Sequence, residues 1–217
     1  YRKTTHAGEI ISCDLVDVRN IPGFQEERYI SVIMDHYTGY TATKALRNKS
    51  GQEVLAHIQE VIAFIEQQSE RNVKILRSDN GLEYVYEGTE LFLLKKGILH
   101  ELTAPYSPAG NGRIERRNRT LIEGLRAALN GEAVEFKWWT YALRHVTYVQ
   151  NRTLTNGDLG LTPFEGLYGI APDVSHIRPF GCECWCLRED VEHKLSSKAE
   201  RCRFLGFKEG LDGYLVL

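Results

Sequence analysis

The sequence predicts an α/β fold, a mixed five-stranded sheet flanked by helices, with a small irregular or β-rich C-terminal extension. Two observations predict it. Three β-rich segments follow one another in the first fifty residues, and beyond them helical spacing alternates with short apolar strands. The chain has 217 residues, of which 42% are hydrophobic, so it is long enough to bury a core without disulfide or metal staples.

The first three strands are expected to form an antiparallel meander. Residues 9–18 are β-rich and apolar on both faces, which is typical of a strand buried between two layers. Residues 28–35 and 38–46 resemble two more strands, joined around the turn-forming string DHYTG at 35–39.

Helices and strands alternate over the next hundred residues. Ser50 is the expected cap of a helix whose apolar residues recur at helical spacing, and residues 73–76 return the chain to the sheet. We then expect a helix at 87–96, a strand at 98–102, a Pro/Gly-rich loop at 103–112, a long helix at 113–129 and a helix at 136–151 that buries Phe136, Trp139, Leu143 and Val146.

The sequence changes character at about Asn156. Glycines and prolines interrupt it, short apolar runs alternate with charged turns, and no helix is expected there. We therefore assign residues 1–155 to the α/β unit, and residues 156–217 to a connector and the start of a truncated β-rich region.

Composition excludes several classes of protein. The chain has 27 Lys and Arg residues and 29 Asp and Glu residues, which gives a net charge of −2. This balance excludes a protein that binds nucleic acid through a large overall positive charge. No apolar run approaches the ~20 residues that cross a bilayer, and the first residues lack the apolar stretch of a signal peptide. We expect an intracellular protein with no membrane partner and with its five cysteines reduced.

Three carboxylates suggest a metal site. Asp14 interrupts the first strand, Asp79 follows the strand at 73–76, and Glu115 lies on the long helix with 35 residues between it and Asp79. Carboxylates at strand ends can together supply the several oxygen ligands that a hard divalent cation needs. The spacing alone is not specific, because two other pairs share it: Asp17 with Glu53 and Asp173 with Glu209.

The strings around these carboxylates are more specific than their spacing. Asp79 lies in RSDNGLEY (77–84), and Glu115 lies in LTAPYSPAGNGRIERRNRTL (102–121). Further motifs follow in order at 8–15, 136–139, 151–152, 163–165, 176–182, 194–207 and 213–214. Across essentially the whole chain, these motifs closely resemble the catalytic core of copia-type LTR retrotransposon integrases, in the retroviral integrase superfamily.

The resemblance implies an RNase H-like fold and a two-metal-ion polynucleotidyl transferase. Its catalytic and metal-binding carboxylates carry over to Asp14, Asp79 and Glu115, which would hold two Mg²⁺ ions, with Mn²⁺ as a substitute. The implied reaction is strand transfer, in which the 3′-hydroxyl of the element cDNA attacks target DNA. The implied partners are the cDNA ends, target DNA and further copies of the chain in a dimer or tetramer. The implied setting is the nucleus, after synthesis in the cytoplasm as part of a Gag-Pol type polyprotein.

Two acidic residues compete with the proposed ligands. Asp17 is an odd number of residues from Asp14, so the two point to opposite faces of a strand and only one can face the site. Glu83 is closer in sequence to Asp79 than Glu115 is, although the resemblance places it in a loop. We favour Asp14 and Glu115.

The resemblance also indicates DNA contacts around Glu115. Tyr106 and Asn111 belong to the loop at 103–112, which prolines stiffen at one end and glycines free at the other, as suits a lid. The helix after it carries a local charge of +3 over residues 111–130. Its expected DNA-binding residues are Arg113, Arg116, Asn118 and Arg119. For Arg117 and Arg126, a solvated charge is the competing interpretation.

Other features leave alternatives open. Cys182, Cys184 and Cys186 alternate and would share one strand face; core packing is favoured over a thiolate metal site. The zinc-binding module that precedes this core in the family is not in the sequence, so an internal segment of a larger protein or a truncated copy is expected. The competing functions are an inactive domesticated DNA-binding or oligomerisation module and a related RNase H-like transposase or nuclease.

Overall fold

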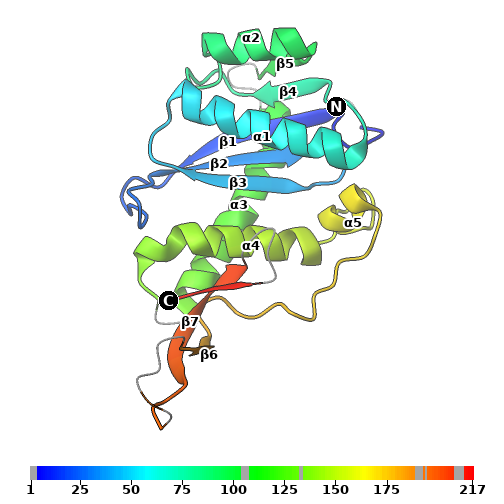
Figure 1. The fold of residues 1–217 in the computed structure, drawn as a ribbon. Coiled ribbons are helices and arrows are strands. Elements are labelled where there is room, and N and C mark those ends of the chain that lie inside the picture. The colour runs from blue at the N-terminus through cyan, green and yellow to red at the C-terminus, as the bar shows by residue number, and fades with distance from the viewer. Residues whose placement is uncertain (1–3, 104–107, 132–133, 189–192, 194, 208–212) are drawn as a thin grey trace.

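A computed structural model describes residues 4–103, 108–131, 134–188, 193, 195–207 and 213–217, with the side chains of 108–111 excepted. Its centre is a five-stranded sheet in the order β3-β2-β1-β4-β5 (Figure 1). The strands are β1 (Ile10–Asp17), β2 (Tyr29–Asp35), β3 (Thr41–Leu46), β4 (Ile75–Ser78) and β5 (Leu99–Leu102). β1, β2 and β3 pair antiparallel, whereas β4 and β5 add parallel strands on the other side of β1. The expected meander and mixed sheet are confirmed.

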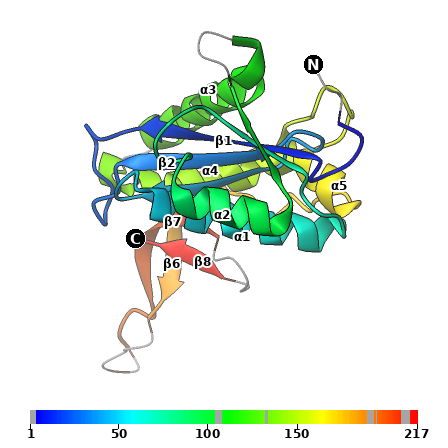
Figure 2. The same ribbon diagram turned by 90° about the horizontal axis from the view of Figure 1, so that it is seen from above.

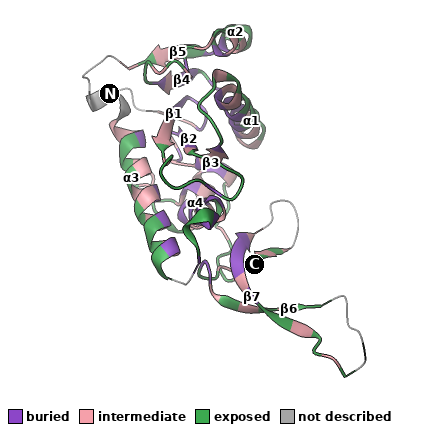
Figure 3. Ribbon diagram, turned by 90° about the vertical axis from the view of Figure 1, so that its left-hand side faces the viewer, coloured by how far each residue is buried: buried purple, intermediate pink, exposed green. Residues whose placement is uncertain are grey.

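Helices cover both faces of this sheet. Helices α1 (Gly51–Ser69) and α2 (Glu87–Lys96) lie on one face, and α3 (Pro108–Gly131) crosses the other, as Figures 2 and 3 show. Helix α4 (Trp139–Thr153) packs on α3 and along β3. β2 contributes side chains to the apolar core on each face of the sheet, because its side chains alternate. Ile33 belongs to the core under α1, and Val32 belongs to the core shared by α3 and α4.

Three sequence predictions need correction in the second half of the chain. The long helix begins at Pro108 rather than 113, because proline is well tolerated in the first turn of a helix and glycines follow it there without breaking the turn. Gly110 and Gly112 are therefore helical, which removes them from the proposed loop. Residues 104–107 of that loop lie outside the described residues.

The predicted helix at 136–151 is a short 3₁₀ turn, Phe136–Trp138, followed by α4. Phe136, expected in the core, is 52% exposed, and Trp138 takes the inward position instead. The Trp138 ring stacks on Phe24 with ring centroids 4.6 Å apart. The change of helical period at this turn is what rotates Phe136 outward.

A short helix, α5 (Pro163–Tyr168), forms where none was expected. Thr162 accepts a hydrogen bond from the backbone of Glu165, whose side chain caps the backbone of Thr162 in return, and Pro163 occupies the first turn. This capping box stabilises even so short a helix. The helix ends at Gly169, whose φ of 71° lies in the left-handed region, which glycine adopts more readily than other residues.

The end of the chain forms the small sheet that the sequence predicts. β6 (Glu183–Leu187), β7 (Ala199–Phe207) and β8 (Tyr214–Val216) pair antiparallel in the order β6-β7-β8. The β6–β7 end extends away from the main sheet, below α4 in Figure 1. Among the described residues, no helix is long and apolar enough to cross a membrane.

The core under α3 yields a stability prediction. Leu121 is fully buried against β2 and α4, so Leu121→Ala should lower the free energy of unfolding by about 2–5 kcal/mol, as cavity-forming substitutions do. Leu94→Ala, at a position 77% exposed, is the matched control and should change it by less than about 0.5 kcal/mol. Urea unfolding measures both, and equal effects would contradict this packing.

A second prediction concerns pH. His145 lies among the rings of Phe180, Phe204 and Phe207, and burial lowers its pKa from 6.5 to about 4. Between those values the unfolded chain binds the proton and the folded chain does not. The contribution of His145 is therefore fully present above pH 6.5 and is lost as the pH falls to about 4. In the parent protein, this effect should lower the free energy of unfolding by on the order of 2–3 kcal/mol between pH 7 and pH 4. The variant His145→Phe should not show this part of the decrease. Parallel pH profiles of unfolding for the variant and the parent protein would contradict it.

Candidate active site

The register between β1 and β4 places two of the candidate carboxylates side by side. The last parallel pair is Ser12 with Arg77, and Asp14 and Asp79 each lie two residues beyond it. Neighbouring parallel strands therefore deliver both residues to the same level of the sheet. Asp79 itself comes directly after the last residue of β4, where the chain leaves the sheet.

Strand alternation separates Asp14 from Asp17. Cys13 belongs to the core under α1, so Asp14 points to the opposite face, which α3 covers, and Asp17 shares the face of Cys13. Asp17 is exposed at the end of β1 and pairs with Arg19, with 2.8 Å between carboxylate oxygen and Nε. Asp14 and Asp17 therefore lie on opposite faces of β1, as strand alternation predicts.

Helix α3 holds Asp14 in place. The amide Nδ2 of Asn118 donates to Asp14 Oδ2 at 2.7 Å, and the backbone N–H of Leu15 donates to Asp14 Oδ1 at 2.8 Å. The other end of the Asn118 amide, Oδ1, is buried and has no hydrogen-bond partner among the described residues. Asn118, which sequence analysis assigned to DNA, is thus a direct neighbour of the first carboxylate.

The electrostatics of Asp14 connect all three carboxylates. The pKa of Asp14 is raised to about 6, mainly by burial and with smaller contributions from the negative charges of Asp79 and Glu115. The hydrogen bonds from Leu15 and Asn118 act in the opposite direction. The charges of Asp79 and Glu115 thus disfavour the ionised form of Asp14, and a bound cation would relieve this repulsion.

The residues fit a hard divalent cation in the kind of donor they offer. Three features favour a cation such as Mg²⁺. The available ligand atoms are oxygens, the half-buried Asp14 carboxylate is close to two other negative charges, and the buried Asn118 Oδ1 has no hydrogen-bond partner among the described residues. Within the ranges that the structure describes, no three His, Cys, Asp or Glu side chains already converge in a ligating arrangement. Asp79 and Glu115 are exposed.

Glu83 remains the competitor for Glu115. The backbone N–H of Gly81 donates to Asp79 Oδ1 at 2.9 Å. A Cβ atom at Gly81 would lie 3.0 Å from that oxygen and 2.8 Å from Glu83 Cδ, so both carboxylates flank this glycine. A side chain at position 81 would displace the flexible end of Glu83.

Tyr84 is a neighbour that sequence analysis missed. Its side chain is 1% exposed, its hydroxyl has no partner among the described residues, and burial raises its pKa well above the ordinary value, helped by the charges of Cys13, Asp14 and Asp79. Its position at the end of the string RSDNGLEY was the available signal. Tyr84 closes the core beneath the carboxylates.

The candidate DNA-binding residues separate into different environments. Tyr106 lies outside the described residues, and for Asn111 only the backbone, in the first turn of α3, is described. Arg113 pairs with Asp158, 2.6 Å apart. Arg116 and Arg119 are exposed.

Arg117 has a structural role that neither sequence interpretation anticipated. Its Nε donates to Thr41 Oγ1 at 2.7 Å and its guanidinium also reaches Asn151 of α4 at 3.4 Å. Burial lowers the pKa of Arg117 to about 10. With Arg113 and Arg116 it lines a polar hollow of about 420 Å³ between α3 and residues 154–158.

Comparisons with known proteins address the family directly. The family described as "Integrase core domain" matches residues 4–108, a range that holds Asp14 and Asp79 and ends before Glu115. The Pol polyprotein of transposon RE2 from Arabidopsis thaliana is 32% identical over 191 residues, covering 88% of this chain and 13% of the relative. The chain belongs to the copia-type retrotransposon integrase family.

A second relative is also a retrotransposon Pol polyprotein. The Pol polyprotein of transposon TNT 1-94 from Nicotiana tabacum is 28% identical over 95% of the chain and 15% of its own length. The chain therefore spans only about an eighth to a seventh of the length of these two relatives.

Two solved structures show the fold. The HTLV-2 integrase catalytic core domain, solved with magnesium in a trimeric form, has a TM-score of 0.59 at 14% identity, covering 76% of this chain and 99% of that one. The BIV integrase catalytic core domain has a TM-score of 0.56 at 21% identity, covering 75% and 95%. The RNase H-like fold expected from the sequence is thereby confirmed.

A prediction for the integrase core follows from the Asn118 contact. Asn118→Leu removes the amide that favours the ionised Asp14, so the pKa of Asp14 should rise above about 6. Carboxyl-carbon NMR titration of the metal-free protein measures it, with Asn130→Leu, further along α3, as the control. An unchanged or lowered Asp14 pKa would show that the amide does not contact this carboxylate in solution.

Proposed function

We propose that this integrase core joins the 3′ ends of element cDNA to target DNA by metal-dependent strand transfer. The observation that carries the proposal is the electrostatic influence on Asp14 of β1 from Asp79, directly after β4, and from Glu115 of α3. These residues come from three separate elements, and their carboxylates are the donors that phosphoryl-transfer metal sites use.

Each residue has a distinct task in this proposal. Asp14, Asp79 and Glu115 hold two divalent cations, Mg²⁺ or Mn²⁺. When bound, such ions activate the attacking oxygen and stabilise the leaving oxygen of an in-line displacement at phosphorus. Asn118 orients Asp14 through the 2.7 Å hydrogen bond, and the Leu15 N–H fixes its second oxygen.

DNA is the proposed substrate, held beside the carboxylates by α3. Arg116 and Arg119 are exposed on the helix that carries Glu115, where they can contact phosphates. Tyr106 and Asn111, just before or within the first turn of α3, are proposed to contact DNA near the scissile phosphate, and Arg113 to contribute once it leaves Asp158. A net charge of −2 is compatible with this local basic surface.

The proposal extends to assembly and setting. We propose a homo-oligomer, a dimer or tetramer, that acts on DNA in the nucleus after release from a polyprotein. The curated relatives are named as polyproteins, and the HTLV-2 neighbour was solved as a trimer. The proposed boundary at residue 155 separates the catalytic unit from the C-terminal connector and sheet.

The first test compares conservative substitutions in the acidic residues. Asp79→Asn and Glu115→Gln should each lower Mn²⁺-dependent disintegration of a branched DNA at least about 100-fold, the size expected when one preorganised active-site group is lost. Asp17→Asn and Glu83→Gln are the matched controls and should retain activity. Near-parental activity of Glu115→Gln together with loss in Glu83→Gln would transfer the third position to Glu83.

Inactivity of the parent protein with retained DNA binding would instead favour a domesticated binding module. Hydrolysis of DNA without joining would favour a nuclease. Both outcomes would contradict strand transfer as the activity of this chain.

DNA binding by α3 makes a separate prediction. Arg116→Ala and Arg119→Ala should each weaken binding across unrelated sequences and reduce the slope of log affinity against log salt by about 1. Arg126→Ala, near the far end of α3, should change neither. Fluorescence anisotropy at several salt concentrations measures all three, and equal slopes for Arg116→Ala and Arg126→Ala would remove α3 from the interface.

A further inference from the structure

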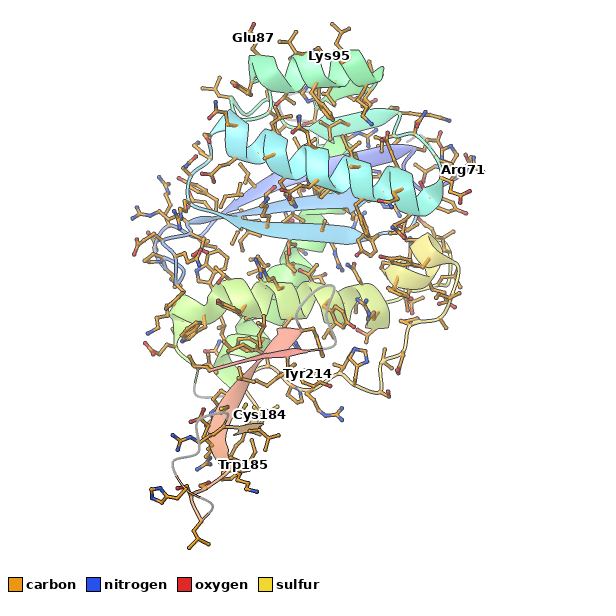
Figure 4. The ribbon with its side chains drawn as sticks, viewed as in Figure 1. Arg71, Glu87, Lys95, Cys184, Trp185 and Tyr214 are labelled. Carbon is orange, nitrogen blue, oxygen red and sulfur yellow. The ribbon has the colours of Figure 1, made fainter. Side chains whose placement is uncertain are left out.

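The small C-terminal sheet gathers four of the five cysteines. Cys184 of β6 lies directly opposite Cys202 of β7, and Cys182 and Cys186 are two residues on either side of Cys184. Because side chains alternate along a strand, Cys184 and Cys186 share one face of β6, whereas Trp185 points to the other. Figure 4 shows Cys184 and Trp185 in this sheet, with Tyr214 of β8 nearby.

Strand pairing brings these thiols within bonding reach of one another. Phe204 N–H donates to Cys182 O and Arg188 N–H donates to Lys198 O, both at 2.9 Å. Because hydrogen-bonded pairs alternate along an antiparallel ladder, the Cys184–Cys202 pair is also a hydrogen-bonded pair. Cα atoms at such a site are about 5.5 Å apart. That separation lies inside the range of about 4.4–6.8 Å that disulfides span.

Cys186 connects the two cysteines of that pair. Its thiol hydrogen-bonds to the side chains of both Cys184 and Cys202, and this contact is the main cause of the raised pKa of Cys202. All of these cysteines are free thiols. Cys202 therefore has two thiols of β6 beside it, one straight across the ladder and one diagonal.

The group is also open to a small reagent. Cys182, Cys184 and Cys186 are half-buried and line a hollow of about 450 Å³ beside Arg178 and Tyr214. The fifth cysteine offers the contrast: Cys13 is 1% exposed in the main core, and its thiol donates to the Arg77 carbonyl at 3.5 Å. Because Cys13 is buried in the main core, a reagent in solution cannot reach its thiol.

We propose that this cysteine group is a thiol-modification site, at which a small disulfide of the glutathione type converts Cys202 and one β6 cysteine, Cys186 or Cys184, into an intramolecular disulfide. The site uses neither the carboxylates nor the DNA-binding arginines, so it is independent of the proposed strand transfer. Its effect is to join β6 and β7 covalently where the sheet extends from the body.

The exchange balances in two steps. A β6 thiolate attacks one sulfur of oxidised glutathione, the disulfide of glutathione breaks, and the released glutathione thiolate takes up a proton. The Cys202 thiolate then attacks the protein sulfur of the mixed disulfide and releases a second glutathione thiol. Two protein thiols are oxidised, one glutathione disulfide is reduced to two thiols, and excess reduced glutathione reverses both steps.

The test incubates the 217-residue chain with oxidised glutathione and counts thiols after denaturation. Five thiols should fall to three, the intact mass should decrease by two hydrogens, and peptide mapping should link Cys202 to Cys186 or Cys184. Titration against defined ratios of reduced to oxidised glutathione should give one reversible midpoint.

Matched variants make the proposal falsifiable. Cys202→Ser and the double variant Cys184→Ser/Cys186→Ser should lose the intramolecular bond. Cys13→Ser should keep it, and so should either β6 single variant, because one partner remains. Near-UV circular dichroism confirms that each variant is folded. Five unreacted thiols, a stable glutathione adduct without ring closure, or an intramolecular bond that persists in Cys202→Ser would each overturn the assignment.

Discussion

The parallel pairing of β1 with β4 is the constraint on which the candidate site depends. β1 is the only strand of the described sheet with an antiparallel neighbour on one side and a parallel neighbour on the other. The antiparallel side completes a stable meander, and the parallel side brings residue 79 to the level of residue 14. A shift of one residue in this register would turn one carboxylate to the face under α1, where the apolar core could not hydrate it.

Helix α3 supplies the rest of the site and is itself fixed by polar contacts. Asn118 bonds to Asp14 of β1, and Arg117, one residue earlier, bonds to Thr41 of β3. Asn151 of α4 completes the arrangement by accepting from the Thr41 N–H at 3.0 Å and donating to the Thr41 carbonyl at 2.8 Å. These directional bonds add to apolar burial and set both the rotation and the position of α3, and thereby of Glu115.

Sequence reasoning predicted the parts of this arrangement that depend on local periodicity. Alternation along β1 predicted that Asp14 and Asp17 lie on opposite faces, and the family resemblance favoured Asp14 as the ligand. The Ser50 cap correctly marked the start of α1. The start of α3 was placed too late because Pro and Gly were interpreted as a loop, although proline also favours a first helical turn. The Thr162–Glu165 capping box was visible in the sequence and outweighs the glycines around α5.

Tertiary choices were beyond the sequence. Nothing in the run of arginines at 116–119 distinguishes Arg117, which turns inward to Thr41, from Arg116 and Arg119, which stay exposed. Likewise, nothing in the sequence indicates that Trp138 is buried and Phe136 is exposed. Helical spacing narrows the choice of face, but tertiary contacts decide which neighbouring side chain is buried. Arg117 contacts Thr41 and Asn151, and Trp138 stacks on Phe24.

The proposed function requires that Asp14, Asp79 and Glu115 form one cation site. Anomalous diffraction from crystals soaked in Mn²⁺ tests it most directly. We expect anomalous density bounded by these three carboxylates, next to the Asn118 amide. Density bound by Glu83 without Glu115, or located only elsewhere on the surface, would contradict it.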